Sequence, residues 1–325
     1  MNRRRLFLFI PILLVVLFAF GPRVALDTTL RPVQLPADLD SYLATEEARF
    51  IDLKPDTAKT IIWADPAQKA PTAVAIVSIH GFSATRHETA PLSDRVAEQL
   101  GGNLYYARLT GHGRSDDAMG EATVNAWLND TMEAVTIGEA LGDDVVLIAS
   151  STGASLLTWL AANDKLDDDV AALVFLSPNF GPANTMAELL LWPWGLEIAQ
   201  LVEGRYRSWE PLNEQHGYYW THRYPVGALL PMMGAVKLAR EADLSKVHQP
   251  LLILNSAEDI VVSPEKTAYY FEQFGSTTKT RIVVKTDHPW GHVLAGDVLS
   301  PRTTEPLAQT IVDWLIPVLD APAGQ

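Results

Sequence analysis

The sequence predicts an α/β fold with a mostly parallel, eight-stranded sheet, helices on both of its faces and a helical insertion. Short apolar, β-branched runs alternate with longer segments of helical periodicity along most of the chain. This alternation is typical of βαβ units, in which covering helices join parallel strands. Residues 178–247 break the alternation and are rich in Trp and Tyr. We therefore expect a core made of residues 46–177 and 248–320, with residues 178–247 as an inserted helical lid.

Eight segments carry strand patterns, and most of the later ones are continuous apolar runs, as expected for strands buried on both faces. The expected strands are residues 48–53, 59–63, 73–79, 103–109, 145–149, 170–176, 251–255 and 281–285. The first two of these are expected to be antiparallel strands at the start of the fold. Helical periodicity covers residues 86–100, 124–141, 264–274 and 303–318, and a further helix after residue 151 ends at residue 163.

Length and composition are sufficient for one large core with an inserted subdomain. The chain has 325 residues, of which 48% are hydrophobic and 20% are charged. Its net charge of -14 argues against nucleic acid or an anionic membrane surface as a partner. The chain contains no Cys, which excludes disulfides, a catalytic thiolate and cysteine-bound metal.

The N-terminus has the pattern of a targeting segment. Arg3, Arg4 and Arg5 precede an uncharged apolar run from Leu6 to Phe20. As a helix rising about 1.5 Å per residue, this run is shorter than the roughly 30 Å of a bilayer's hydrocarbon core. It reaches that thickness if it continues to residue 26.

Residues 1–26 are therefore expected to form a membrane anchor or a signal segment, followed by a linker over residues 27–45. An uncleaved anchor would place the body on the non-cytoplasmic side, as on the periplasmic side of a bacterial inner membrane. The alternative is secretion after cleavage near Gly21, which Pro22 disfavours.

A serine stands at a sharp strand-to-helix corner. Ser151 follows the apolar run 145–149 and precedes a helical pattern, and Gly153 lies two residues after it. Such a corner holds a serine on a strained turn with its hydroxyl above the sheet, which predicts a nucleophile. Ala149 replaces the first glycine of the G-x-S-x-G pattern. Capping of the following helix is the alternative role for this serine.

Five motifs follow one another in a familiar order: His80-Gly81-Phe82, Gly111-His112-Gly113-Arg114-Ser115, Ser151, Asp259 and His292. This set resembles the α/β-hydrolase superfamily, in its branch of monoacylglycerol lipases and carboxylesterases, over roughly residues 72–318. The order Ser, Asp, His along the chain is that of this fold.

The resemblance implies a catalytic triad and the role of each member. Ser151 would be the nucleophile, His292 the general base and then acid, and Asp259 the group that orients the imidazole. His288, beside Asp287 in the same loop, is the alternative base. His292 is preferred because its flanking residues are like those of similar carboxylesterases.

The resemblance also implies an oxyanion hole made of the backbone N–H groups of Phe82 and Thr152. It implies neither a cofactor nor a metal. A metal site built from His80, His87 and His112 is conceivable, but no helical H-x-x-x-H pair or acidic partner supports it.

The expected function is hydrolysis of a carboxylic ester, such as an acylglycerol or similar lipophilic ester, through an acyl-enzyme. The aromatic-rich insertion and the apolar N-terminus motivate a lipid substrate and a membrane partner. A lysophospholipase, a thioesterase or a serine aminopeptidase of the same fold remains open, because the triad serves all three. A membrane-tethered binding domain without activity is the non-enzymatic alternative.

Overall fold

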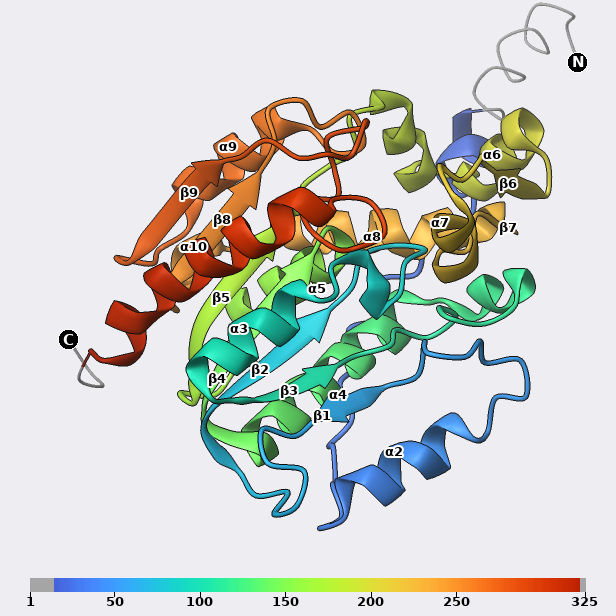
Figure 1. The fold of residues 1–325 in the computed structure, drawn as a ribbon. Coiled ribbons are helices and arrows are strands. Elements are labelled where there is room, and N and C mark those ends of the chain that lie inside the picture. Colours follow the sequence, from blue (N-terminus) through green and yellow to red (C-terminus); the bar gives the residue numbers. More distant parts are fainter. Residues whose placement is uncertain (1–14, 322–325) are drawn as a thin grey trace, which may run out of the picture.

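A seven-stranded sheet forms the centre of the protein (Figure 1). The structure, a computed structural model, describes residues 15–321. The strand order is β1-β3-β2-β4-β5-β8-β9, and only the pairing of β1 with β3 is antiparallel. The strands are β1 (Thr60–Ile62), β2 (Thr72–Ile79), β3 (Asn103–Tyr106), β4 (Gly142–Ser150), β5 (Val170–Leu176), β8 (Leu251–Asn255) and β9 (Lys279–Val283).

Helices cover both faces of this sheet, which confirms the predicted fold class. In Figure 1, α3 (Leu92–Leu100) and α10 (Pro301–Leu319) lie in front of the sheet. Behind it lie α4 (Val124–Leu141) and α5 (Thr152–Ala162), and α9 (Pro264–Gln273) connects β8 to β9. Short 3-10 turns occur at η1 (Arg86–Glu88), η2 (Asp116–Glu121) and η5 (Leu244–Lys246).

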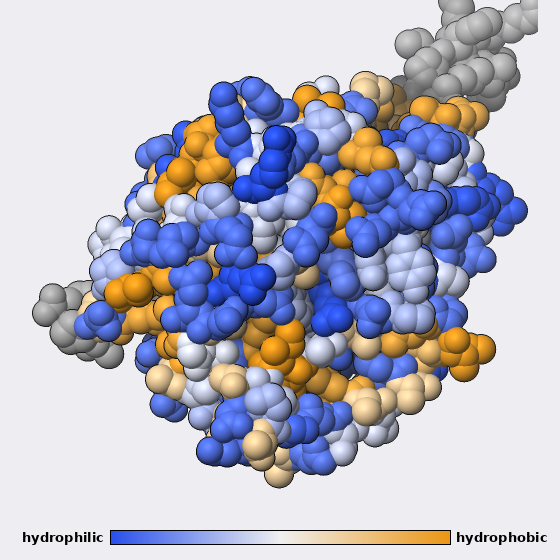
Figure 2. All heavy atoms as spheres, viewed as in Figure 1, coloured by the Kyte–Doolittle hydropathy of each residue, from blue (hydrophilic) through white to orange (hydrophobic). Residues whose placement is uncertain are grey.

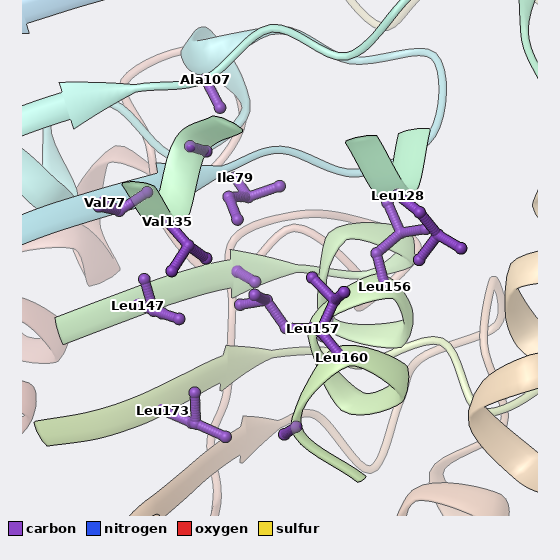
Figure 3. Close-up of a cluster of buried hydrophobic side chains, with 14 of the residues drawn as sticks. Val77, Ile79, Ala107, Leu128, Val135, Leu147, Leu156, Leu157, Leu160 and Leu173 are labelled. Atoms are coloured by element: carbon purple, nitrogen blue, oxygen red, sulfur yellow. The ribbon is translucent and has the colours of Figure 1, made fainter. Parts of the chain in front are cut away.

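Side chains of the central strands alternate between two apolar cores, because successive residues of a strand point to opposite faces. Ile76 packs with the core under α3 and α10, whereas its neighbour Val77 packs with the core under α4 and α5. Figure 3 shows the second of these cores, in which side chains from β2, β4 and β5 meet Leu128, Val135 and Leu156 of the two helices. Burial on both faces explains why these strands are uniformly apolar.

The predicted strand count was wrong by one. Residues 48–53, expected as a strand, form turns. The Phe50 ring instead lies under the guanidinium groups of Arg108 and Arg114, 4.8 and 4.3 Å from its centroid. Asp52 accepts a hydrogen bond from Arg114 Nε at 2.8 Å. Phe50 and Asp52 therefore contact two arginines, and the segment folds as turns and not as a strand.

Helix α2 (Leu39–Glu47) begins within the range expected as a linker. Asp38 caps its N-terminus, and Leu39 and Leu43 are buried against the core. This part of the chain therefore packs on the body.

The chain before α2 is also held against the body. Pro22 O accepts the backbone N–H of Trp194 at 2.8 Å, and Asn129 Oδ1 accepts that of Arg31 at 2.8 Å. Of the expected anchor, residues 1–14 lie outside the described residues. From residue 15 to residue 321, no helix has the length and apolar character needed to cross a bilayer.

The insertion between β5 and β8 lies beyond the carboxyl ends of the strands (Figure 1). It is mainly helical, and it also contains a small antiparallel β-ribbon that the sequence analysis missed. Its elements are η3 (Thr185–Leu191), α6 (Gly195–Glu203), β6 (Tyr206–Ser208), α7 (Glu214–Tyr219), β7 (Arg223–Pro225), η4 (Val226–Ala228) and α8 (Leu229–Glu241). On the face shown in Figure 2, polar residues separate several small apolar groups.

A buried ion pair fastens α2 to the loop after β3. Glu47 accepts two hydrogen bonds from Arg108, at 2.7 and 2.8 Å, and only 7% and 3% of the two side chains are exposed. Arg108 also donates to His112 O at 3.1 Å. The pair therefore links the N-terminal helix to a loop that borders the candidate site.

Replacing Glu47 with Gln should lower the free energy of unfolding by about 3–5 kcal/mol, because it leaves the Arg108 charge buried and uncompensated. The neighbouring Glu46 pairs with Arg49 at the surface, so Glu46→Gln should cost less than about 1 kcal/mol. Urea denaturation of the two variants measures the difference. Equal, small losses would contradict a structural role for the buried pair.

Candidate functional site

Ser151 occupies the turn between β4 and α5 in a backbone conformation that is rare for any residue but glycine. Its φ is 49° and its ψ is -113°. The turn is held from both sides, because Ser151 N–H donates to Leu176 O at 2.9 Å and Ser151 O accepts Asn179 N–H at 3.1 Å. The end of β5 thus supports the strained corner that the sequence predicts.

Two glycines let neighbouring segments approach this corner closely. A Cβ on Gly153 would lie 2.8 Å from His80 O and 2.9 Å from Ile79 O. A Cβ on Gly81 would lie 2.9 Å from Ser151 Cβ. Larger residues at either position would push the loop after β2 away from Ser151.

Asp259 and His292 meet although they are distant in the sequence. His292 Nδ1 lies 2.8 Å from Asp259 Oδ2, and both side chains are almost fully buried. The other carboxylate oxygen of Asp259 accepts the backbone N–H groups of Val261 and Val262 at 2.8 and 3.0 Å. These contacts fix the carboxylate, and a carboxylate bound at Nδ1 leaves Nε2 of a neutral imidazole free to accept a proton.

The environment of His292 favours its charged form. Burial lowers the pKa of the imidazole, but the charge and hydrogen bond of Asp259, with a further contribution from the Glu88 charge, outweigh it and raise the pKa above its usual value. The site can therefore stabilise an imidazolium.

His288, the alternative base, is engaged elsewhere. Its Nδ1 accepts the backbone N–H groups of His292 and Val293 at 3.3 and 3.0 Å. Burial, followed by the charges of His292 and His216, lowers the pKa of His288 to about 3. His288 thus orders the loop that carries His292.

The backbone N–H groups of Phe82 and Thr152 both lie next to Ser151. Thr152 follows Ser151 in the sequence, and Phe82 follows Gly81, which approaches Ser151 closely. Within residues 15–321 neither N–H donates to a protein acceptor. Unpaired N–H groups beside a candidate nucleophile can stabilise negative charge that develops on a bound acyl group.

His80 and His112 brace the loops around these donors. Leu109 N–H donates to His80 Nε2 at 3.1 Å, and Ser83 N–H donates to His112 Nε2 at 2.9 Å. Burial lowers the pKa of His80 to about 4. The part of the chain that the structure describes contains no group of three or more side chains placed to hold a metal ion.

Glu88 is a buried carboxyl at the site that the sequence analysis missed. Its Oε2 accepts the backbone N–H of Gly81 at 2.6 Å, and burial raises its pKa. It therefore holds the residue before Phe82 in place. A glutamate seven residues after a glycine carries no recognisable motif, so the sequence offered no signal for it.

A cavity of about 520 Å³ opens beside these groups, large enough for a small organic molecule. Ser151, His292 and Phe82 line it, together with many residues of the insertion. Its apolar lining residues include Ala187, Leu189, Leu190, Ile198, Ala199, Val202, Trp209, Trp220, Leu229, Met232, Ile260, Val261 and Val262.

Comparisons with known proteins agree with this architecture. A protein-family model described as "Serine aminopeptidase, S33" (Hydrolase_4) matches residues 70–288. The thermostable monoacylglycerol lipase of Bacillus sp. (strain H-257) is 23% identical over 236 residues, which cover 71% of this chain and 88% of that lipase.

Solved structures share the fold at low sequence identity. One, from the metagenome-derived lipolytic enzymes LipS and LipT, has a TM-score of 0.65 at 19% identity and covers 81% of this chain and 98% of its own. The Paleococcus ferrophilus monoacylglycerol lipase has a TM-score of 0.56 at 16% identity, and the match covers 80% of this chain and 98% of that lipase. The family match spans more than half of the sequence, and the chain therefore belongs to the Hydrolase_4 family of α/β-hydrolases.

Proposed function

We propose that the protein is a serine hydrolase that cleaves carboxylic esters through an acyl-enzyme on Ser151. The observation that carries this proposal is the buried contact of 2.8 Å between His292 Nδ1 and Asp259 Oδ2, at a cavity that Ser151 also lines. A serine hydroxyl is a weak nucleophile unless a base accepts its proton, and His292 is the base that the site offers.

The proposed reaction has two halves. His292 Nε2 takes the proton of Ser151 as the hydroxyl oxygen attacks the ester carbonyl, and Asp259 stabilises the resulting imidazolium. The N–H groups of Phe82 and Thr152 donate to the oxyanion. The imidazolium then protonates the alcohol as the ester bond breaks. Water attacks the acyl-enzyme in the second half, with His292 again accepting and returning one proton.

The lining of the cavity supports a lipophilic ester, such as an acylglycerol, as the substrate. Most side chains around Ser151 are apolar, and many come from the insertion, which would act as a lid. The relatives named as monoacylglycerol lipases favour the same substrate class. The family description leaves serine aminopeptidase activity as the second candidate.

A fluorophosphonate probe should label the protein, and Ser151→Ala should abolish labelling because it removes the attacking oxygen. Ser155→Ala is the matched control. Ser155 lies in α5, its hydroxyl donates a hydrogen bond to Asn179 O, and the residue does not line the cavity. In-gel fluorescence reads the result. If the parent protein stays unlabelled while a known serine hydrolase is labelled, the serine-hydrolase proposal is wrong and a binding domain without activity is favoured.

The acid limb of the kcat/KM–pH profile should lie above the ordinary histidine pKa of about 6.5, because His292 must be neutral to accept a proton and its pKa is raised. Glu88→Gln keeps an acceptor for Gly81 N–H but removes a charge, so the limb should move to lower pH. The exposed Glu258 provides the control variant Glu258→Gln, whose limb should not move. An unchanged limb in Glu88→Gln would contradict this electrostatic account.

We also propose that the N-terminal segment tethers the chain to a membrane, with its body on the non-cytoplasmic side. Arg3–Arg5 before the uncharged run Leu6–Phe20 supports this. Membranes washed with high salt and carbonate should retain the full-length chain, and Leu13→Arg should weaken retention because a charge opposes insertion. Recovery of a shortened soluble chain would favour cleavage near Gly21 instead.

A further inference from the structure

The described part of the chain begins against the insertion, beside α6 (Figure 1). Residues 15–19 are helical, and the residues that follow bind Trp194, which stands directly before α6. Pro22 O accepts the backbone N–H of Trp194 at 2.8 Å, and Leu17 O accepts its indole N–H at 3.2 Å. Both N–H donors of Trp194 therefore bind the N-terminal segment.

Gly21 is the point of closest approach between the two segments. A Cβ on Gly21 would lie 2.1 Å from Trp194 Nε1 and 2.3 Å from Trp194 Cδ1, so the indole occupies the space that a side chain would need. Next to it, the ring of Phe18 meets that of Trp192 edge to face, with centroids 6.2 Å apart. We call the contacts of Trp194 with residues 17–22 the clamp.

Trp194 has a backbone conformation that is unfavourable for a bulky residue. Its φ is 65° and its ψ is 21°, in the left-handed region. Such a conformation persists only where the surroundings fix it, and the clamp supplies such contacts. Trp194 is also the N-cap of α6, and its carbonyl accepts the backbone N–H of Ile198 at 2.9 Å. The clamp therefore fixes the residue from which α6 starts.

Helix α6 has little else to hold it. Of its nine residues only the first is buried, and helices with few buried contacts open easily. The ion pair between Glu203 and Arg207 at its far end is about 40% exposed and contributes little. Nevertheless Ile198, Ala199 and Val202 of α6 line the cavity. The position of this apolar wall therefore depends on how the helix is held at its start.

The chain after the clamp is held by the body of the protein. A Cβ on Gly234 of α8 would lie 3.2 Å from the side chains of both Val24 and Leu26. Farther along, Thr29 O accepts a hydrogen bond from Asn125 Nδ2 of α4 at 2.8 Å. The clamp thus joins α6 to a segment that is itself packed on α4 and α8.

We propose that the clamp sets the acyl-chain selectivity of the enzyme by fixing α6 as an apolar wall of the cavity. This inference rests on the proposed function, because it takes an acyl chain bound to Ser151 as the occupant of the cavity. A long chain extends from Ser151 onto the apolar side chains of α6, whereas a butyryl group stays near Ser151. Cleavage of the chain near Gly21 would remove Leu17 and weaken the clamp.

The test compares p-nitrophenyl dodecanoate with p-nitrophenyl butyrate, which share an alcohol and differ only in acyl length. In the full-length chain, Gly21→Ala should displace the indole of Trp194, because the added methyl group takes its place. The ratio of kcat/KM for the dodecanoate to kcat/KM for the butyrate should fall about tenfold, which corresponds to the lost burial of roughly two methylene groups. The value for the butyrate itself should not change.

Gly227→Ala is the matched control. Gly227 faces α6 from η4, but a Cβ there would lie 3.6 Å from Leu196 Cδ1, which is an ordinary contact. Its ratio should equal that of the parent. Trp194→Ala should lower the ratio as Gly21→Ala does. The double variant should show no further fall, because the two changes act through one contact.

Amide hydrogen exchange gives a readout that does not depend on activity. The amides of α6 should exchange faster in Gly21→Ala than in the parent, because the start of the helix is released. Exchange in Gly227→Ala should match that of the parent.

A parental ratio in Gly21→Ala would overturn the proposal. Equal losses on both esters would overturn it as well, because they would indicate a general structural defect. Either result, in a parent protein that fluorophosphonate labels, leaves the proposed ester hydrolysis standing. A parent protein that neither labels nor cleaves either ester refutes the proposed function, and the acyl-chain selectivity with it.

Discussion

The conformation of Ser151 is the constraint on which the rest of the site depends. A positive φ at a residue with a Cβ is unfavourable and persists only where the surroundings fix it. Here the end of β5 holds the turn through Leu176 and Asn179, and Gly153 lets α5 pass close to the loop after β2. Because β4 is central in the sheet, the loops that follow its parallel neighbours reach the same place. The sheet thereby fixes the position of the hydroxyl before any ligand binds.

The site combines charge stabilisation with an apolar surround. Asp259 and Glu88 both raise the pKa of His292, while the cavity wall beyond them is largely aliphatic and aromatic. Electrostatic interactions are stronger where water is excluded, so a few polar groups suffice. The unpaired N–H groups of Phe82 and Thr152, beside Ser151, are among the polar groups of this site.

The central sheet was predictable because local patterns encode it, whereas the meeting of Asp259 with His292 was expected from the resemblance to α/β-hydrolases. Apolar runs mark buried strands, and the carboxyl ends of parallel strands share one edge. Other features depend on tertiary contacts that no local pattern reports. Residues 48–53, for example, form turns and not the expected strand, and Phe50 packs under two arginines. Likewise, Glu88 and His216 became part of the site only once the fold brought them to the cavity.

A crystal structure of the protein with a dodecyl phosphonate bound covalently tests the central claim most directly. The account predicts phosphorus on Ser151 Oγ and a phosphoryl oxygen within hydrogen-bond distance, about 3 Å, of the N–H groups of both Phe82 and Thr152. It also predicts His292 Nε2 beside the position of the leaving group. An adduct on another residue, or a phosphoryl oxygen turned away from both N–H groups, would contradict it.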